Sequence, residues 1–288
     1  MKIFDYLKLI RINQPTGIWL LFIPCLAGIA LSYKITQNNL PFNLLKFILL
    51  FFIGSVLMRS AGCIVNDLLD QDFDQKVLRT KNRPLASKKV SRKEAIILLF
   101  ILLDLSFIVL YQFNFATILS GFFALFLVIT YPLMKRFFNI PQLYLGLTFN
   151  FGVIMASYAT LNHLTLGHLL LYLALLLWTL IYDTIYAFQD IEDDLKIGVK
   201  SSAITINNFF SNPKKILHFL SLTIFFSLLF IGLLNKFNLI FFILALLALG
   251  FMTLELNSCN LRNPQQCLKF FKKNIVFGLL ILIAIILG

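Results

Sequence analysis

Long apolar runs alternate with short polar connections along almost the whole chain. A helix needs about 20 predominantly apolar residues to cross a bilayer, and nine stretches of the sequence fit that description. They lie near residues 16–33, 42–66, 94–112, 115–132, 141–161, 166–190, 215–234, 237–256 and 270–287. The pattern predicts an all-α integral membrane protein of about nine transmembrane helices, folded as a single domain over residues 1–288.

The composition agrees with this prediction. Of the 288 residues, 59% are hydrophobic and only 13% are charged, which is far from the balance found in soluble globular domains. Residues 1–14 are charged and poor in apolar side chains, and the first span lacks a convincing cleavage site. We therefore expect no cleaved signal peptide and expect the first span to remain as a signal anchor.

The basic residues are distributed unevenly. Of the 25 Lys and Arg residues, 21 lie in the N-terminal segment, in the even-numbered connections or at the span ends beside them. Because cytoplasmic segments are enriched in Lys and Arg, we expect the N-terminus and the basic connections in the cytoplasm of a bacterium, with the protein in the inner membrane and the C-terminus outside. The net charge of +12 then reflects topology and contact with the lipid bilayer. It is no argument for a nucleic-acid partner.

An acidic cluster closes the second predicted span. Asn66, Asp70 and Asp74 recur every four residues, so on a continuous helix they fall within about 80° of one another. Asp67 lies at the edge of that face. Asp72 points to the opposite side and is expected to be a solvated surface charge.

A second acidic cluster closes the sixth predicted span. Asp190 and Asp194 are again four residues apart, whereas Glu192 lies roughly opposite them on the helix and is expected to be solvated. Seven residues before each cluster stand Arg59 and Asp183. Ionisable side chains that deep in apolar helices are costly and usually functional.

Oxygen-rich faces of this kind suit a hard cation. Closely spaced carboxylates repel one another unless a cation lies between them, and oxygen donors without His or Cys favour Mg²⁺ or Mn²⁺. For any single Asp, the plain alternative is a solvated residue at a helix end. The presence of two clusters of the same form favours metal binding.

A basic loop follows each acidic cluster. Arg79, Lys81 and Arg83 follow the first, and Lys196 and Lys200 follow the second. The same order of parts in each half is a weak internal repeat. Metal ions and cations at the rim of an apolar bundle suit a diphosphate attached to a hydrophobic tail, because the metal neutralises the charge that develops as the C–O bond breaks. A dry pocket would then protect the allylic carbocation from water.

These motifs resemble those of the UbiA-type intramembrane prenyltransferases. The signature Asn-Asp-x-x-Asp-x-x-x-Asp stands at 66–74, and Asp-x-x-x-Asp stands at 190–194. The likeness continues through 59–63, 79–85, 131–136, 182–184 and 194–201. Within the family, the chain looks most like the 4-hydroxybenzoate polyprenyltransferases, which attach a polyprenyl chain to carbon 3 of 4-hydroxybenzoate in ubiquinone synthesis.

The resemblance implies nine helices around a cavity open toward the membrane, and it implies roles for individual residues. Mg²⁺ and the diphosphate would be held by Asn66, Asp70, Asp74, Asp190 and Asp194, with Asp67 and Asp193 as further members of the set. Contacts to the substrates, polyprenyl diphosphate and 4-hydroxybenzoate, would come from Arg79, Arg83, Tyr131, Lys135, Arg136, Lys196 and Lys200. The catalytic candidates are Asp67, Asp190 and Arg136. The Arg136 guanidinium is the candidate for the benzoate carboxylate, because its planar fork matches a carboxylate.

Other readings stay open at this point. A secondary transporter also carries membrane-embedded acids and repeats, but its charges should lie near the bilayer midplane, whereas these cluster at one face. Enzymes of the same family that make menaquinone, haem or tocopherol precursors differ only in the acceptor pocket. The four cysteines show no close-paired metal spacing, so we predict neither a disulfide framework nor a zinc site. We expect His163, His168 and His218 at the surface or the membrane interface.

Overall fold

The computed structural model describes residues 2–37, 44–77 and 79–288, and every regular element in these ranges is helical. The first half contains α1 (Lys2–Leu9), α2 (Thr16–Ile35), α3 (Leu44–Leu69), α4 (Gln71–Asp74), α5 (Arg92–Leu110), α6 (Phe115–Phe137), α7 (Pro141–Asn150) and α8 (Gly152–Leu161). The second half contains α9 (Leu166–Ala187), the 3₁₀ helix η1 (Phe188–Asp190), α10 (Ile191–Ile197), α11 (Ser202–Phe209), α12 (Pro213–Leu234), α13 (Leu239–Ser258) and α14 (Pro264–Leu287). The prediction of an all-α protein is confirmed.

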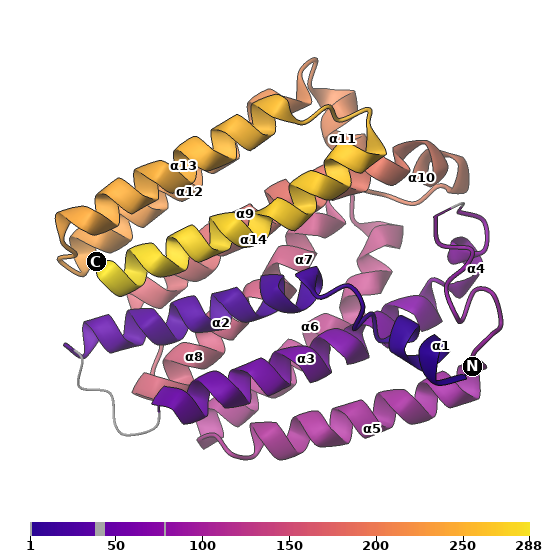
Figure 1. The fold of residues 1–288 in the computed structure, drawn as a ribbon, viewed down its shortest axis with the longest axis horizontal. Coiled ribbons are helices and arrows are strands. Elements are labelled where there is room, and N and C mark those ends of the chain that lie inside the picture. The colour runs from indigo at the N-terminus through magenta and orange to yellow at the C-terminus, as the bar shows by residue number, and fades with distance from the viewer. Residues whose placement is uncertain (1, 38–43, 78) are drawn as a thin grey trace.

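The long helices run side by side as a bundle (Figure 1). Within the described ranges the chain crosses the bundle nine times if α7 and α8 are counted as one crossing, and eight of these crossings are long and apolar enough to span a membrane. The exception is α5, because Lys93, Glu94 and Asp104 shorten its apolar stretch. The two termini lie at opposite ends of the bundle (Figure 1), as an odd number of crossings requires.

Most predicted spans coincide with helices to within a few residues, and the differences have physical causes. The first two residues of the span at 42–66 lie outside the described residues. The span at 141–161 is interrupted at Phe151, so that α7 and α8 replace one helix. The helix α14 begins six residues before the predicted span at 270–287, because Lys269 in its second turn lowers the local hydropathy without preventing a helix.

Local sequence explains where several helices begin. At α5, the Ser91 Oγ accepts a hydrogen bond from the Glu94 N–H at 3.2 Å, and the Glu94 carboxylate accepts one from the Ser91 N–H at 2.8 Å. Asn212 and Asn263 cap α12 and α14, and each is followed by a proline at the first helical position. Proline fits there because its missing N–H needs no partner. A cap of this kind is worth about 1 kcal/mol.

The helix α9 forms the centre of the larger apolar core. Trp178 and Tyr182 are fully buried and pack edge to face with their ring centroids 5.2 Å apart. The Trp178 indole N–H donates to Asn274 Oδ1 of α14 at 2.9 Å. Because α7, α12 and α14 all pack against α9, the end of this helix that leads into the second acidic cluster is held firmly in place.

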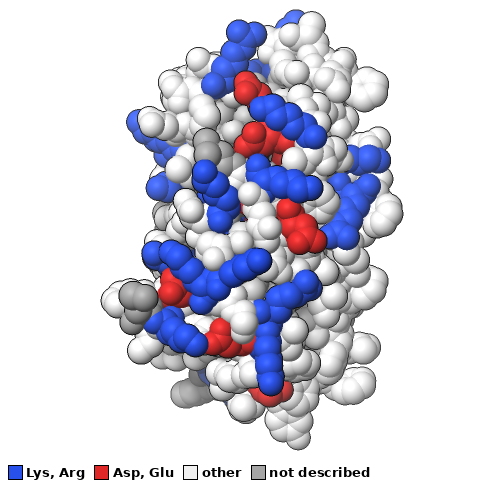
Figure 2. Space-filling model, turned by 90° about the vertical axis from the view of Figure 1, so that its right-hand side faces the viewer, with Lys and Arg blue, Asp and Glu red and all other residues white. Residues whose placement is uncertain are grey.

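The first acidic cluster spans the C-terminal end of α3 and the second follows the end of α9, both at the same end of the bundle. The helix α3 stops at Leu69, and Asp70 (φ −98°, ψ 8°) bends the chain into α4. The helix α9 stops at Ala187, and Asp190 (φ −111°, ψ 8°) bends the chain into α10. The continuous helical face expected for each cluster is therefore interrupted, because Asp is a poor helix former. Figure 2 shows acidic and basic side chains mixed on this end of the molecule, which we call the charged end.

The expectation that His168 lies at the surface is wrong. Its side chain is fully buried in the first turn of α9. The ring nitrogen Nε2 lies 3.0 Å from both Ser32 Oγ and the Gly28 carbonyl oxygen of α2, and Nδ1 lies 2.7 Å from Thr165 Oγ1. A buried polar ring is stable when its nitrogens are hydrogen-bonded, and these partners come from parts of the chain that local sequence does not connect.

Candidate active site

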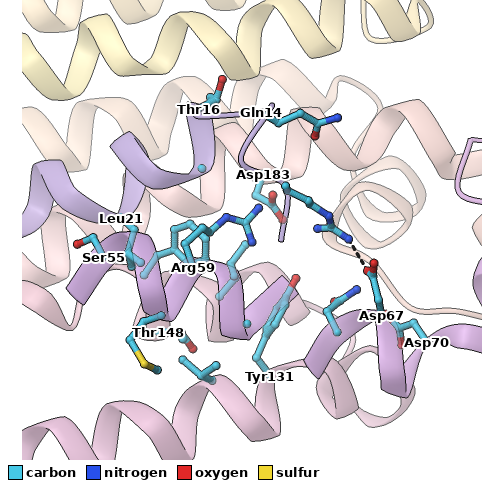
Figure 3. Close-up of a pocket in the computed structure, with 18 of the residues that line it drawn as sticks. Gln14, Thr16, Leu21, Ser55, Arg59, Asp67, Asp70, Tyr131, Thr148 and Asp183 are labelled. Atoms are coloured by element: carbon cyan, nitrogen blue, oxygen red, sulfur yellow. Dashed lines mark hydrogen bonds and ion pairs between the residues drawn. The ribbon is translucent and has the colours of Figure 1, made fainter. Parts of the chain in front are cut away.

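A cavity of about 1320 Å³ extends from the charged end into the bundle. One end of it is lined by both acidic clusters and by cations of the basic loops, and the other by apolar side chains of α3, α5 and α6. Figure 3 shows Asp67 and Asp70 at one side of this space, with Arg59, Tyr131 and Asp183 pointing into it. The fold therefore brings polar residues from both halves of the chain to one site.

The carboxylates of the first cluster pair with guanidinium groups. Asp67 is 1% exposed and accepts hydrogen bonds from Arg11 and from Arg83, whose Nη1 lies 3.2 Å from its Oδ1. The same Nη1 lies 2.7 Å from Asp74 Oδ2. Burial raises the pKa of the Asp74 carboxyl above its ordinary value, although Arg83 acts in the opposite direction. Two carboxylates of this cluster therefore share the Arg83 guanidinium.

Lys135, near the end of α6, joins the first cluster across the cavity. Its Nζ lies 3.0 Å from Asp70 Oδ2 and 3.5 Å from Asn66 Oδ1. The same ammonium lies 5.9 Å from the centroid of the Tyr131 ring. The Lys135 carbonyl accepts a hydrogen bond from the Lys200 N–H at 3.0 Å. The basic last turn of α6 thus connects the first acidic cluster to the loop that follows the second.

The second cluster is covered by a residue from the other half of the chain. Arg79 Nε donates to Asp190 Oδ1 at 2.8 Å, and Arg79 Nη1 donates to the Tyr186 hydroxyl at 3.0 Å. The guanidinium also lies 5.3 Å from the centroid of the Tyr186 ring. Asp194 lines the same cavity. The basic loop of the first half therefore closes over the carboxylates of the second half, and this contact joins the two motifs into one site.

The donor set fits a hard divalent cation only together with a phosphate ligand. In the described part of the chain, no three His, Cys, Asp or Glu side chains lie close enough to form a metal site by themselves. Mg²⁺ typically keeps several waters and is held by one or two carboxylates plus substrate phosphates. Protein oxygens suited to this arrangement line the cavity at Asn66, Asp70, Asp74, Asp190 and Asp194. These residues fit Mg²⁺ that arrives with a diphosphate.

Arg136 lies at the rim of the cavity. Its Nη2 donates to the Leu69 carbonyl oxygen at 2.8 Å, and its guanidinium lies 5.6 Å from the centroid of the Phe73 ring. Leu69 is the last residue of α3, where a cation also interacts favourably with the helix dipole. Arg136 thus contacts a residue on each side of the bend at Asp70, besides lining the cavity.

A second guanidinium lies deeper. Arg59 projects from α3 over the Phe149 ring, 5.7 Å from its centroid, and its Nη1 lies 2.9 Å from Cys63 Sγ. A Cβ atom added at Gly17 would lie 2.3 Å from Arg59 Nε, so that glycine makes room for the side chain. Asp183 lines the same region. Among the ion pairs of the described residues, neither Arg59 nor Asp183 takes part.

The far end of the cavity is apolar and reaches the lipid-facing surface. Phe107 and Leu110 line it from α5, and Phe122 and Leu125 line it from α6. Phe107 and Phe122 are also 47% and 51% exposed, so the same rings bound the cavity and face outward. The expectation of a cavity open toward the membrane is confirmed.

Some predicted site residues lie apart from the cavity. The Lys196 side chain is 73% exposed and lies 3.9 Å from an Asp193 carboxylate oxygen, and neither residue lines the cavity. Lys200 does line it, and its Nζ donates to a backbone carbonyl of α6 at 3.1 Å. Asp72 and Glu192 are exposed, as their positions on the helix predict.

Three further contributors were missed in the sequence. Lys8 and Lys272 line the cavity from α1 and α14, and Tyr186 binds Arg79. Tyr186 stands four residues before Asp190, so it shares a helical face with that acid, and this spacing was an available signal. Lys272 gave no such signal, because its place at the cavity depends on how α14 packs against η1.

Comparisons with known proteins identify relatives over nearly the whole chain. The model of the UbiA prenyltransferase family matches residues 21–281. The chain is 40% identical over 278 residues to the 4-hydroxybenzoate octaprenyltransferase of Francisella tularensis subsp. novicida, covering 96% of this chain and 95% of that protein. It is 41% identical over 284 residues to the mitochondrial 4-hydroxybenzoate polyprenyltransferase of Drosophila pseudoobscura pseudoobscura, covering 98% of this chain and 70% of that protein.

Solved structures share the fold at lower identity. A UbiA homolog from Aeropyrum pernix K1, in its apo form, superposes with a TM-score of 0.77 at 23% identity, covering 93% of this chain and 96% of that one. A UbiA homolog from Archaeoglobus fulgidus bound to GPP and Mg²⁺ superposes with a TM-score of 0.70 at 18% identity, covering 96% of this chain and 99% of that one. At these identities the likeness shows the fold alone.

Proposed function

This chain belongs to the UbiA prenyltransferase family, and on that premise we propose that it transfers a polyprenyl group from polyprenyl diphosphate to carbon 3 of 4-hydroxybenzoate, a step of ubiquinone biosynthesis. The names of relatives that are 40% identical over nearly the full length support this choice of acceptor. The prenyl transfer is proposed to depend on Mg²⁺. It takes place in the membrane, which this multi-pass protein spans repeatedly.

The observation that carries the proposal is the polarity of the cavity. Its polar end gathers two acidic clusters with Arg79, Arg83 and Lys135, and its other end is apolar and reaches the lipid-facing surface. A polyprenyl diphosphate has the same division, with a charged head and a long apolar tail. The head fits the polar end only with a cation between it and the carboxylates, because phosphate and carboxylate otherwise repel each other.

The chain's own side chains account for binding and departure of the diphosphate. Arg79, Arg83 and Lys135 each pair with a carboxylate of the two acidic clusters. A diphosphate bound at these clusters would be within their reach, and they would form charge-assisted hydrogen bonds with it. Bound Mg²⁺ would supply further neutralisation of the charge that develops on the diphosphate as the allylic C–O bond breaks. The diphosphate leaves with the bonding electron pair, and the apolar walls keep water away from the allylic carbon.

The aromatic ring then supplies the new bond. Carbon 3 of 4-hydroxybenzoate attacks the allylic carbon, and the ring regains aromaticity when the proton on carbon 3 leaves. Asp183 is the proposed acceptor of this proton, because it lines the cavity and takes part in no ion pair among the described residues. The benzoate carboxylate is proposed to bind a guanidinium: Arg136 at the rim, as the sequence predicts, or Arg59 in the interior, which the geometry adds.

The orientation in the membrane is also part of the proposal. We infer that the charged end faces the cytoplasm of a bacterium and that the protein lies in the inner membrane. The support is the concentration of basic residues at this end (Figure 2) and the rule that Lys and Arg mark cytoplasmic segments.

The acceptor is tested by product identity. The purified chain in lipid nanodiscs is incubated with a polyprenyl diphosphate, Mg²⁺ and, separately, 4-hydroxybenzoate or acceptors of the menaquinone, haem and tocopherol pathways. We expect one product, and its mass should equal that of 4-hydroxybenzoate plus the prenyl group minus one hydrogen. NMR should show that the prenyl group is attached to carbon 3. Prenylation of another acceptor in preference would overturn the choice of acceptor. Prenylation of none would overturn the proposed function itself.

A further inference from the structure

The short helix α1 has two apolar faces, and only one of them is packed. Leu9 is fully buried and Tyr6 is half-buried. Ile3, Phe4 and Leu7 are 72%, 71% and 37% exposed. At about 100° per residue these three side chains fall within an arc of about 100°, on the side of the helix away from Tyr6 and Leu9. We call Ile3, Phe4 and Leu7 the outer stripe of α1.

The packed face fixes α1 to the charged end of the bundle. Leu9 belongs to one apolar cluster with Ile64 of α3, and with Leu85 and Val90 of the loop before α5. Lys2 at the start of α1 donates to Glu94 in the first turn of α5 at 2.9 Å. The helix therefore lies across the ends of α3 and α5, beside the N-terminal end of α5 (Figure 1).

The outer stripe lies at the level where the lipid-facing surface of the bundle begins. One turn beyond the Lys2 partner Glu94, the helix α5 exposes Ile96 and Ile97, which are 41% and 52% exposed, and Phe100 follows them at 61%. An exposed apolar surface on a membrane-spanning helix faces acyl chains. A helix with an apolar stripe at this boundary has the form of an interfacial helix, which lies in the plane of the membrane.

The charge around α1 selects among lipid headgroups. Lys88, Lys89, Arg92 and Lys93 are exposed on the segment that flanks the buried Val90, a residue of the apolar cluster to which Leu9 of α1 belongs. Each Lys or Arg near an anionic membrane surface is attracted to it. This group of cations beside an apolar stripe is complementary to anionic phospholipid rather than to a zwitterionic surface.

We propose that α1 is an in-plane anchor that binds anionic phospholipid headgroups through these cations and inserts Ile3, Phe4 and Leu7 among the adjoining acyl chains. The occupant of the outer stripe is lipid of the leaflet at the charged end.

The anchor has a direct connection to the active site. Two residues after the buried Leu9, the backbone of Arg11 takes φ +54°, a left-handed conformation that non-glycine residues rarely adopt. That turn directs the Arg11 guanidinium onto Asp67 of the first acidic cluster. Bonds within the chain close this turn, since the Ile12 N–H donates to the Leu7 carbonyl oxygen at 3.3 Å and the Arg11 N–H donates to the Lys8 carbonyl oxygen at 3.1 Å, as at many helix C-termini. Arg11 therefore follows the position of α1, and a membrane surface that fixes α1 helps to hold Arg11 in the site.

The first test measures how deeply the outer stripe of α1 lies in the bilayer, and it does not depend on enzyme activity. A nitroxide is attached to Ile3→Cys, and separately to Lys215→Cys as an exposed reference on α12, in nanodiscs of phosphatidylglycerol. The four native cysteines are buried, so the parent chain gives the background labelling. We expect the label at position 3 to collide readily with oxygen and to be protected from a water-soluble nickel complex, unlike the label at 215. Equal access of nickel to both positions would overturn the proposal and leave the stripe free for a protein partner.

The second test measures how lipid contact at α1 affects substrate use at the active site. The KM for polyprenyl diphosphate is compared in phosphatidylglycerol and phosphatidylcholine nanodiscs for the parent chain, for the double variant Ile3→Ser/Phe4→Ser, and for Phe209→Ser. Phe209 is 79% exposed on α11 and has no connection to Arg11, so it is the matched control.

We expect the KM of the parent and of the control to rise at least about threefold in phosphatidylcholine. The double variant should show the higher KM in both lipids. If the parent has the same KM in both lipids, or if the double variant keeps the lipid response of the parent, the proposal is overturned. Loss of all turnover in every sample would instead count against the proposed function, and the depth measurement would still decide the placement of α1.

Discussion

At the scale of single residues, the site contains cations already paired with acids, and two guanidinium groups, those of Arg59 and Arg136, that take part in no ion pair among the described residues. Arg79, Arg83 and Lys135 each contact a carboxylate in the described structure. Arg59 instead contacts an aromatic ring and a thiol. A carboxylate ligand would gain most from a guanidinium that has no acid of its own. Arg59 therefore competes with Arg136 for the acceptor, and substitution can separate the two.

Substitution of Arg136 by Ala is predicted to weaken use of 4-hydroxybenzoate and to leave polyprenyl diphosphate unaffected. A charge-assisted hydrogen bond is worth about 1.5 to 3 kcal/mol, so the KM for 4-hydroxybenzoate should rise by roughly ten- to more than hundredfold. Arg136→Lys should recover only part, because an ammonium lacks the planar fork. The apparent KM of each substrate is measured with the other saturating, in parallel with Arg59→Ala. If only Arg59→Ala raises the KM for 4-hydroxybenzoate, the acceptor belongs to Arg59.

Substitution of Gly17 by Ala is predicted to displace Arg59, since the added Cβ would lie 2.3 Å from its Nε. If Arg59 binds the acceptor, the KM for 4-hydroxybenzoate should rise about tenfold or more, and Arg59→Ala should remove any further effect of the Gly17 change. Gly250→Ala is the matched control, because a Cβ there meets nothing within 4 Å. Additive effects of the Gly17 and Arg59 substitutions would show that Gly17 acts by another route.

At the scale of elements, the sequence predicted which helices exist better than how they end. Long apolar runs, each with an Asn cap followed by a proline, define α12 and α14 by local signals alone. The bends at Asp70 and Asp190 were not predicted, because hydropathy reports burial and does not report backbone direction. Those bends matter for function, since they turn the acidic ends of α3 and α9 into the cavity. The contact of Arg79 with Asp190 joins residues 111 positions apart, and no local pattern predicts a pair at that separation.

Substitution of Arg79 by Ala is predicted to raise the KM for polyprenyl diphosphate about tenfold or more, since the cation lost makes charge-assisted hydrogen bonds. The KM for 4-hydroxybenzoate should change little. Lys81→Ala is the control from the same loop: Lys81 is exposed and takes part in no side-chain hydrogen bond or ion pair among the described residues. Equal effects of both substitutions would mean that the loop attracts the diphosphate by charge alone and that the Arg79 geometry is unimportant.

At the scale of the whole molecule, the arrangement is set by the alternation of apolar spans and basic connections. The opposite placement of the two termini in Figure 1 agrees with the nine crossings that this alternation predicts. The sequence predicted the number and order of the crossings because the bilayer requires a similar length of apolar helix for each of them. The sequence did not predict that His168 is buried or that Lys272 lines the cavity. Both positions depend on how helices from distant parts of the chain pack together.

The orientation gives a prediction at this scale. A reporter that works only in the cytoplasm is fused after Gly288, and the same reporter is fused within the basic loop at Lys89. We expect no signal from the first fusion and a strong signal from the second, because the basic connections mark the cytoplasmic side. The reverse pattern would invert the proposed topology, and two strong signals would contradict an odd number of crossings.

The central claim is that the two acidic clusters, from different halves of the chain, bind one metal-bound diphosphate. The most direct measurement is calorimetric titration of the purified chain with an unreactive polyprenyl thiolodiphosphate, with Mg²⁺ and then with EDTA. The same titration is made on Asp70→Asn, on Asp190→Asn and on the exposed reference Asp72→Asn. We predict binding in Mg²⁺ only, a loss of at least about tenfold in affinity for each of the first two variants, and no change for Asp72→Asn. Unchanged affinity in EDTA, or parent-like affinity for either Asp70→Asn or Asp190→Asn, would contradict the claim.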